Sequence, residues 1–162
     1  MSTELRAALN HAVTDELTAA LATITHCVNQ LSEEQVWWRP PQSMNAIGNL
    51  LVHLTGNVKQ VIVNNLTGAP DTRDRPAEFA TRDPIPKAEL LHRLTDVVTQ
   101  AKAAFVAATD ERFAQVVRVN KNDWTGLQAA LRSMAHFRGH TQEIIHMTRE
   151  LLGDKYQYLG PK

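Results

Sequence analysis

The chain has 162 residues, with 17 basic and 17 acidic side chains, so its formal net charge at neutral pH is zero. This balance gives no bulk attraction for a phosphate backbone or an anionic lipid surface, which argues against nucleic-acid binding and polybasic membrane binding. Apolar residues make up 43% of the chain and charged residues 21%, as in ordinary globular proteins. We therefore expect one folded domain over residues 1–162.

The single cysteine and the hydropathy of the chain both favour a location in the cytoplasm. The single cysteine, Cys27, excludes an internal disulfide and is typical of a reducing cytoplasm. The N-terminal residues carry no long apolar run after their charges, unlike a secretory signal. No stretch approaches the ~20 apolar residues that a membrane span requires. We expect a cytoplasmic protein that does not enter the membrane.

Apolar side chains recur every three or four residues in four long segments, the spacing of amphipathic helices. The predicted helices cover residues 4–31, about 45–65, about 86–105 and about 125–152. We expect Ser43 or Asn45 to cap the start of the second helix, and Asp123 or Thr125 to cap the fourth. Gly153 is expected to end the fourth helix.

The segments between these helices are predicted to be irregular. Residues 31–34 form a turn, and the prolines that follow Trp37 and Trp38 favour an extended connector. Residues 68–86 are polar and proline-rich and are expected to be a long loop. Residues 109–123 are also predicted as loop, because one short extended piece at 116–119 has no partner strand. These expectations define an all-α four-helix bundle, whose long second connector leaves room for a crossover.

Two of the seven histidines, His136 and His140, are four residues apart on the fourth helix. This spacing stacks their side chains one turn apart, so both imidazoles can reach one metal ion. The pair alone is weak evidence, since chance produces such spacings. His53, in the middle of the second helix, is the candidate third ligand. Three imidazoles with an open position are typical of a catalytic metal site.

The surroundings of His53 leave two interpretations open. A polar stripe follows one line of the second helix and consists of Asn49, His53, Asn57, Gln60 and Asn64. It is either a solvated face or the wall of a wet cavity that opens toward the fourth helix. Glu143 lies on the line of His136 and His140, and it is a candidate fourth ligand, a hydrogen-bond acceptor that fixes an imidazole, a general base, or a partly exposed carboxylate.

Other polar and aromatic residues are weaker candidates. Surface or structural roles are expected for His11, His26, His92 and His146. Cys27 lies among apolar neighbours and is expected to be an inert thiol. The three tryptophans, Trp37, Trp38 and Trp124, are expected to plug the end of the bundle, with a substrate mouth as the alternative.

Two segments resemble the DinB-like (damage-inducible) superfamily. They are SMNAIGNLLVHL, which ends with His53 and Leu54, and HFRGH, which runs from His136 to His140. The resemblance extends over essentially the whole chain and implies a four-helix bundle that holds a divalent metal through three histidines. It assigns metal-ligand roles to His53, His136 and His140. Many relatives have glutamine where this chain has Glu143, which leaves the role of that carboxylate open.

The resemblance also suggests a chemistry. Characterised members of the superfamily include thiol-dependent transferases and isomerases that use bacillithiol, mycothiol or glutathione. We therefore expect a metal-dependent enzyme in which zinc or nickel, or else iron, activates a water or a thiol, with Glu143 as proton shuttle. The expected partner is a small molecule, such as a low-molecular-weight thiol, and a homodimer is a common assembly of such bundles. The alternative is a metal-binding bundle without catalysis that binds a small molecule or another protein.

Overall fold

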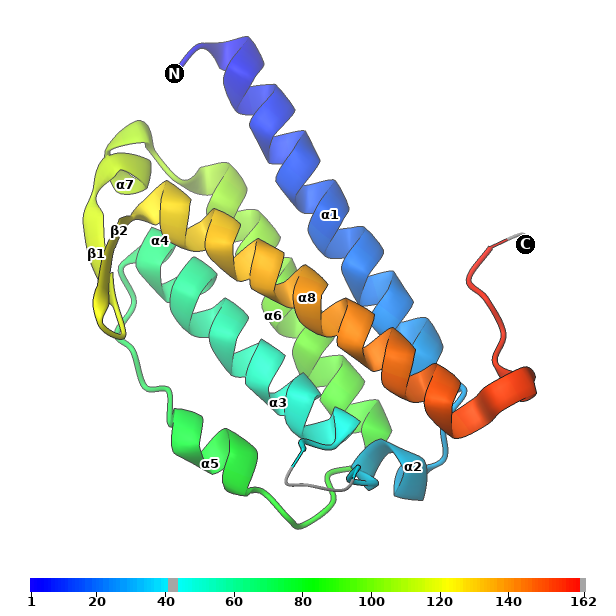
Figure 1. The fold of residues 1–162 in the computed structure, drawn as a ribbon. Coiled ribbons are helices and arrows are strands. Elements are labelled where there is room, and N and C mark those ends of the chain that lie inside the picture. Colours follow the sequence, from blue (N-terminus) through cyan, green and yellow to red (C-terminus); the bar gives the residue numbers. More distant parts are fainter. Residues whose placement is uncertain (41–43, 161–162) are drawn as a thin grey trace.

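A computed structural model describes residues 1–40 and 44–160, and an all-α bundle dominates it, as predicted (Figure 1). The long helices are α1 (Thr3–Asn29), α3 (Ile47–Val58), α6 (Lys87–Ala107) and α8 (Gly126–Leu152). The second of these continues through a π-helical turn, η1 (Lys59–Asn64), into α4 (Asn65–Thr67). Within the described residues, no helix is both long enough and apolar enough to cross a membrane.

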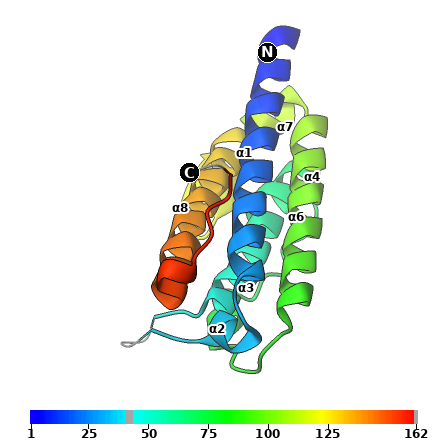
Figure 2. The ribbon, with the colours of Figure 1, turned by 90° about the vertical axis from the view of Figure 1, so that its right-hand side faces the viewer.

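The four long helices do not follow a simple up-down order. α3 and α6 start at the same end of the bundle and run in the same direction, whereas α1 and α8 run in the opposite direction (Figure 1). Each of α1 and α3 packs against both α6 and α8 (Figure 2). Residues 68–86 therefore have to return along the outside of the bundle, which is the crossover that the long connector predicted.

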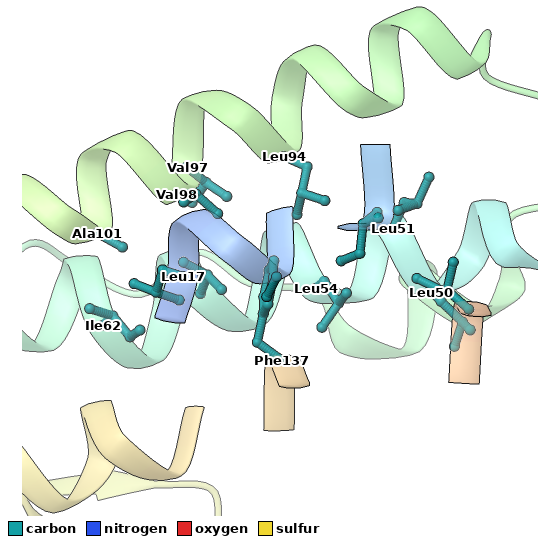
Figure 3. Close-up of a cluster of buried hydrophobic side chains, with 14 of the residues drawn as sticks. Leu17, Leu50, Leu51, Leu54, Ile62, Leu94, Val97, Val98, Ala101 and Phe137 are labelled. Atoms are coloured by element: carbon teal, nitrogen blue, oxygen red, sulfur yellow. The ribbon is translucent and has the colours of Figure 1, made fainter. Parts of the chain in front are cut away.

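The core lies along the axis that the four helices share. Leu17, Leu54, Leu94 and Phe137 come from α1, α3, α6 and α8, respectively, and each is fully buried (Figure 3). Their side chains meet where the apolar stripes of the sequence face each other. Burial of a large aliphatic or aromatic side chain contributes about 1.5–3 kcal/mol, so these contacts are the main reason that the helices pack together.

The helix ends agree with the sequence at one predicted cap and differ at the other. Thr125 caps α8, and its side chain accepts a hydrogen bond from the backbone N–H of Gln128 at 3.2 Å. The prediction for the second helix was wrong for Asn45, because α3 begins after Ala46 and has no side-chain cap. The start of α3 is instead held by packing, since a Cβ on Gly48 would lie 2.7 Å from the Trp37 ring. Ser43 lies outside the described residues.

Two connectors that were predicted as irregular contain short helices. α2 (Glu33–Trp37) starts with a reciprocal capping box between Ser32 and Gln35. The crossover contains α5 (Arg75–Ala80), which is capped by the Asp74 side chain and has a proline in its first turn. These local caps stabilise single helical turns that are too short to produce an apolar stripe, so periodicity did not reveal them.

The prediction of a loop at 109–123 was also wrong. This segment contains α7 (Asp110–Ala114), followed by an antiparallel hairpin of β1 (Val116–Val119) and β2 (Asn122–Thr125). Val119 pairs with Asn122, so the turn is only two residues long, and Asn120 adopts a positive φ of 55°. Asparagine tolerates this left-handed conformation. The polar sequence of β2 concealed a partner strand that lies directly after the turn. The chain then ends with η2 (Gly153–Lys155) after α8.

Candidate metal centre

Three imidazoles converge between α3 and α8. His53 comes from α3, and His136 and His140 come from successive turns of α8. The ring centroids lie 4.4–5.3 Å apart, and one nitrogen from each ring lies within 4.8 Å of the others. The Nε2 atoms of His53 and His136 are 2.9 Å apart. The structure thus brings together the three histidines that the sequence singled out.

The donor set fits a divalent transition metal. Two nitrogens that each lie ~2.1 Å from one ion are at most about 4.2 Å apart, so small side-chain rotations would bring the three rings to binding distance. All three donors are imidazoles, which suit zinc, nickel, iron and copper better than magnesium or calcium. No fourth histidine, cysteine or carboxylate joins this group in the described chain. Three protein ligands leave at least one coordination position open.

Carboxylates contact the far nitrogens of two of these rings. Glu78 Oε2 lies 2.9 Å from Nδ1 of His53, and Glu143 Oε2 lies 2.6 Å from Nδ1 of His140. A carboxylate there accepts a hydrogen bond from Nδ1–H, which keeps the proton on Nδ1 and leaves the lone pair on Nε2. This is the tautomer that binds a metal through Nε2, and such carboxylate–histidine pairs are common around metal ions.

The carboxylate of Glu78 is itself part of a buried ion pair. Arg73 donates to its two oxygens from Nε at 2.6 Å and from Nη2 at 2.8 Å. Both side chains are almost inaccessible, with exposed fractions of 6% for Arg73 and 8% for Glu78. Arg73 Nη2 also lies 3.0 Å from Nδ1 of His53. A guanidinium only donates hydrogen bonds, so its proximity to Nδ1 competes with the donation from that nitrogen to Glu78.

The polar stripe of the second helix binds the crossover segment to the bundle. Asn49 donates to the backbone carbonyl of Glu78 at 3.1 Å, and Asn64 donates to the carbonyl of Pro70 at 3.1 Å. Asn49, Asn64 and His53 are all buried. The solvated-face interpretation of this stripe is therefore wrong. Asn49 and Asn64 instead satisfy backbone carbonyls of the crossover segment that covers them, and the bond from Asn49 helps to fix the position of Glu78.

The burial of the rings sets their protonation. Desolvation lowers the pKa of His53, although hydrogen bonding to Glu78 acts in the opposite direction. Desolvation also lowers the pKa of His136 to about 4, and the neighbouring charges of Arg73 and Arg75 contribute. Both rings are therefore neutral near pH 7, which is the form that coordinates a metal.

A cavity of about 330 Å³ opens beside the histidines. Its wall includes His53 and His136, and the β-hairpin closes one side with Trp124. Glu143 and His140 are not among its lining residues. This volume is near the lower end of the range for small-molecule sites. Trp124 thus lines a cavity, which agrees with the alternative interpretation of the tryptophans better than with a plug of the bundle end.

The remaining candidates lie elsewhere. His11 and His92 are exposed and face Asp15 and Asp96, respectively, on their own helices. His26 contacts the carbonyl of Gln157, 2.6 Å from its Nε2. None of these rings belongs to the convergent group.

The other residues that were expected to have structural or surface roles also lie away from the three-histidine cluster. His146 is exposed on α8. Cys27 is fully buried, and burial raises the pKa of its thiol, which disfavours the reactive thiolate. Trp37 donates from its indole N–H to the carbonyl of Ile85 at 3.0 Å. Trp38 is 41% exposed and does not plug the bundle.

Two residues of the centre, Arg73 and Glu78, were missed by the sequence analysis. Both come from the crossover, whose return path along α3 cannot be read from periodicity. The signal that could have indicated them was the polar stripe itself. Buried amides need partners, and only the long polar connector was available to supply them.

Fold and site together define an all-α helical bundle with a three-histidine cluster suited to a divalent metal. A solved structure of a DinB-like protein from Bacillus subtilis (YjoA) is similar over 92% of this chain and 96% of its own, with a TM-score of 0.68 and 13% identity. At that identity the likeness concerns the fold alone, and it agrees with the predicted all-α four-helix bundle.

The family model described as "Protein of unknown function (DUF1572)" matches residues 6–161, so the chain belongs to this family. No curated protein matches the sequence.

Proposed function

We propose that this protein is a metal-dependent enzyme in which His53, His136 and His140 hold a divalent ion, with zinc or nickel as the first candidates and iron as a third. The observation that carries the proposal is the convergence of three imidazoles, two of them backed by carboxylates, beside a cavity of about 330 Å³. When bound, such an ion supplies Lewis acidity that lowers the pKa of a bound water or thiol.

The chain's own residues prepare the centre for this role. Glu78 and Glu143 accept hydrogen bonds from the Nδ1–H groups of His53 and His140 and so orient both rings, and we assign the two carboxylates as positioning residues. Residues of the crossover and Trp124 form part of the cavity wall. A role for Glu143 as proton shuttle stays a prediction. It would require the side chain of Glu143 to turn toward the open coordination position, because Glu143 itself does not line the cavity and the metal would occupy the Nε2 lone pair of His140.

The first test is the metal content of the purified protein. Mass spectrometry of the metals is expected to find about one divalent transition metal per chain, and His136→Ala is expected to lose it. His146→Ala is the matched control, because this exposed histidine lies on the same helix and outside the cluster. A folded wild-type protein that takes up no stoichiometric zinc, nickel or iron would contradict the proposal.

A second candidate function is a non-catalytic metal-binding bundle that binds a small molecule or another protein. It is favoured by one observation, namely that no free carboxylate lines the described cavity to move a proton. Cobalt-substituted protein distinguishes the two. A change in its visible spectrum on addition of azide or a thiol indicates an exchangeable coordination position, as the enzyme requires. An unchanged spectrum supports the non-catalytic bundle.

The reaction and the partners are part of the same proposal. A thiol activated at the centre would attack an electrophilic small molecule, whereas an activated water would hydrolyse its substrate. We propose a low-molecular-weight thiol as one candidate partner, a cytoplasmic location and a homodimeric assembly. Enzyme assays with pairs of thiols and electrophiles test the first, and sedimentation tests the last.

A further inference from the structure

Two arginines at the cavity have no acidic partner. Arg75 and Arg132 both line the cavity, and neither forms an ion pair with a carboxylate in the described part of the chain. Arg73, by contrast, is neutralised by Glu78. No aspartate or glutamate is among the described lining residues. The cavity therefore carries two uncompensated positive charges in a protein with zero net charge.

Aromatic rings hold both guanidinium groups in place. The Cζ of Arg75 lies 5.1 Å from the centroid of Phe79, and the Cζ of Arg132 lies 4.8 Å from that of Trp124. Phe79 in turn lies against His53, with ring centroids 4.8 Å apart. Such stacking fixes the planar group while leaving its N–H donors free to bind a ligand. Arg75 is thus connected to the histidine cluster through one intervening ring.

The rest of the cavity wall is mixed in character. Val61, Val119 and Trp124 provide an apolar surface, and Ser133 donates to Asn57 at 2.7 Å on the adjoining wall. The apolar part suits the carbon body of a ligand, and the guanidinium forks suit the paired oxygens of an oxyanion. His53 and His136 lie at the same wall, so a ligand seated here would reach the metal centre.

We propose that this cavity binds a small molecule that carries one oxyanion group, a carboxylate or a phosphoryl group, held between Arg75 and Arg132, with a short apolar body against the hairpin. The role of this ligand as a substrate rests on the proposed function. The binding of the anion by the two arginines does not depend on that function. A volume of about 330 Å³ matches a compact molecule.

Binding can be followed with simple probes and the indole N–H signal of Trp124. We would titrate ¹⁵N-labelled protein with benzoate and with phenylphosphonate, and with benzamide as the neutral analogue of benzoate. The anions are expected to shift the Trp124 signal, which Trp124→Phe identifies, and benzamide is expected to bind at least about tenfold more weakly. The Trp37 indole, bonded to a backbone carbonyl, is the internal control that stays unchanged.

Three variants show whether the two arginines are responsible. Arg75→Gln and Arg132→Gln are each expected to weaken binding of benzoate about tenfold or more. Arg149→Gln is the matched control, because Arg149 lies on the same helix as Arg132, also stacks on an aromatic ring and lies away from the cavity. It is expected to bind like the wild type. If a glutamine variant loses its folded spectrum, the corresponding lysine variant replaces it, with a smaller loss expected.

The outcomes separate this inference from the proposed metal centre. Absence of any response to both anions at Trp124, or equal binding by the wild type and both arginine variants, would overturn the anion site whatever the metal content. A preference for phenylphosphonate over benzoate assigns a phosphoryl group, and the reverse assigns a carboxylate. Arginine-dependent binding by a protein that takes up no metal would support the anion site and refute the proposed metal centre.

Discussion

The most informative single change is Glu78→Gln, because Glu78 contacts both His53 and the buried guanidinium of Arg73. Glutamine keeps the shape of the side chain and removes its charge. It is expected to weaken the binding of the metal and to destabilise the fold, and these two effects have separate causes that can be measured separately.

The structure sets the size of each effect. Removing the carboxylate that orients a metal-binding histidine weakens metal affinity about 10- to 100-fold, or ~1.4–2.8 kcal/mol. Arg73 and Glu78 are 6% and 8% exposed, so the change also leaves a buried guanidinium without its counter-charge. Loss of one partner of a buried ion pair costs about 3–5 kcal/mol of folding stability. We expect both losses in the same variant.

Glu143→Gln is the matched comparison. Glu143 makes the equivalent contact with His140, but its side chain is 38% exposed and it has no arginine partner in the described chain. Its substitution is expected to weaken metal affinity about tenfold and to change stability by less than about 1 kcal/mol. Chelator competition measures the affinities, and urea unfolding of the metal-free proteins measures the stabilities.

The pair of variants can refute the reasoning directly. If Glu78→Gln binds zinc and nickel as tightly as the wild type, Glu78 does not position His53. If both variants lose the same free energy of unfolding, the buried Arg73–Glu78 ion pair is not the source of the loss. The assignment of these two side chains as a charged pair would then be wrong.

Four further results are expected. In the metal-free folded protein, the pKa values of His53 and His136 are lowered, to about 4 for His136. Below about pH 6.5 the unfolded chain therefore binds more protons than the folded chain. The free energy of unfolding should therefore fall as the pH drops from 6.5 to 4, and a flat urea-midpoint profile would contradict this. Zinc at about 100 times its Kd should raise the melting temperature by roughly 5–10 °C, reversibly with EDTA and not in His136→Ala. Phe137→Ala should lower the free energy of unfolding, measured with urea, by about 3–5 kcal/mol. A loss below about 1 kcal/mol would show that neighbouring side chains move in to fill the cavity that the substitution leaves. In Gly56→Ala the new Cβ would overlap Oε1 of Glu78, so metal affinity by chelator competition should fall as in Glu78→Gln; unchanged affinity would mean that the carboxylate can shift without consequence.

The sequence was informative about the bundle because long helices repeat their apolar residues many times. The stripe of α8, for example, runs over 27 residues and ends at Gly153 as predicted. Short elements lack that redundancy. α5 has six residues and depends on the Asp74 cap, and the hairpin depends on the left-handed conformation of Asn120. Such features are set by single residues and by tertiary contacts, so periodicity does not reveal them.

Some residues of the site could likewise be predicted from the sequence, and others could not. The spacing of His136 and His140 is a local property of one helix, and it could be recognised without a structure. The addition of His53 required the packing of α3 against α8, which periodicity does not reveal, so its assignment depended on its place in mid-helix and on the family resemblance. Glu78 could not be predicted, since its contact with His53 spans 25 residues and depends on the path of the crossover.

The crossover described above has a consequence for how this architecture can diversify. The imidazoles belong to the long helices, whereas Arg73, Arg75 and Glu78 are all encoded between residues 68 and 86. Changes within residues 68–86 alone would alter the charge of the cavity and its selectivity for ligands. The three imidazoles would stay unchanged. Chimaeras that swap this stretch between relatives would reveal how far ligand choice is inherited independently of the helical scaffold.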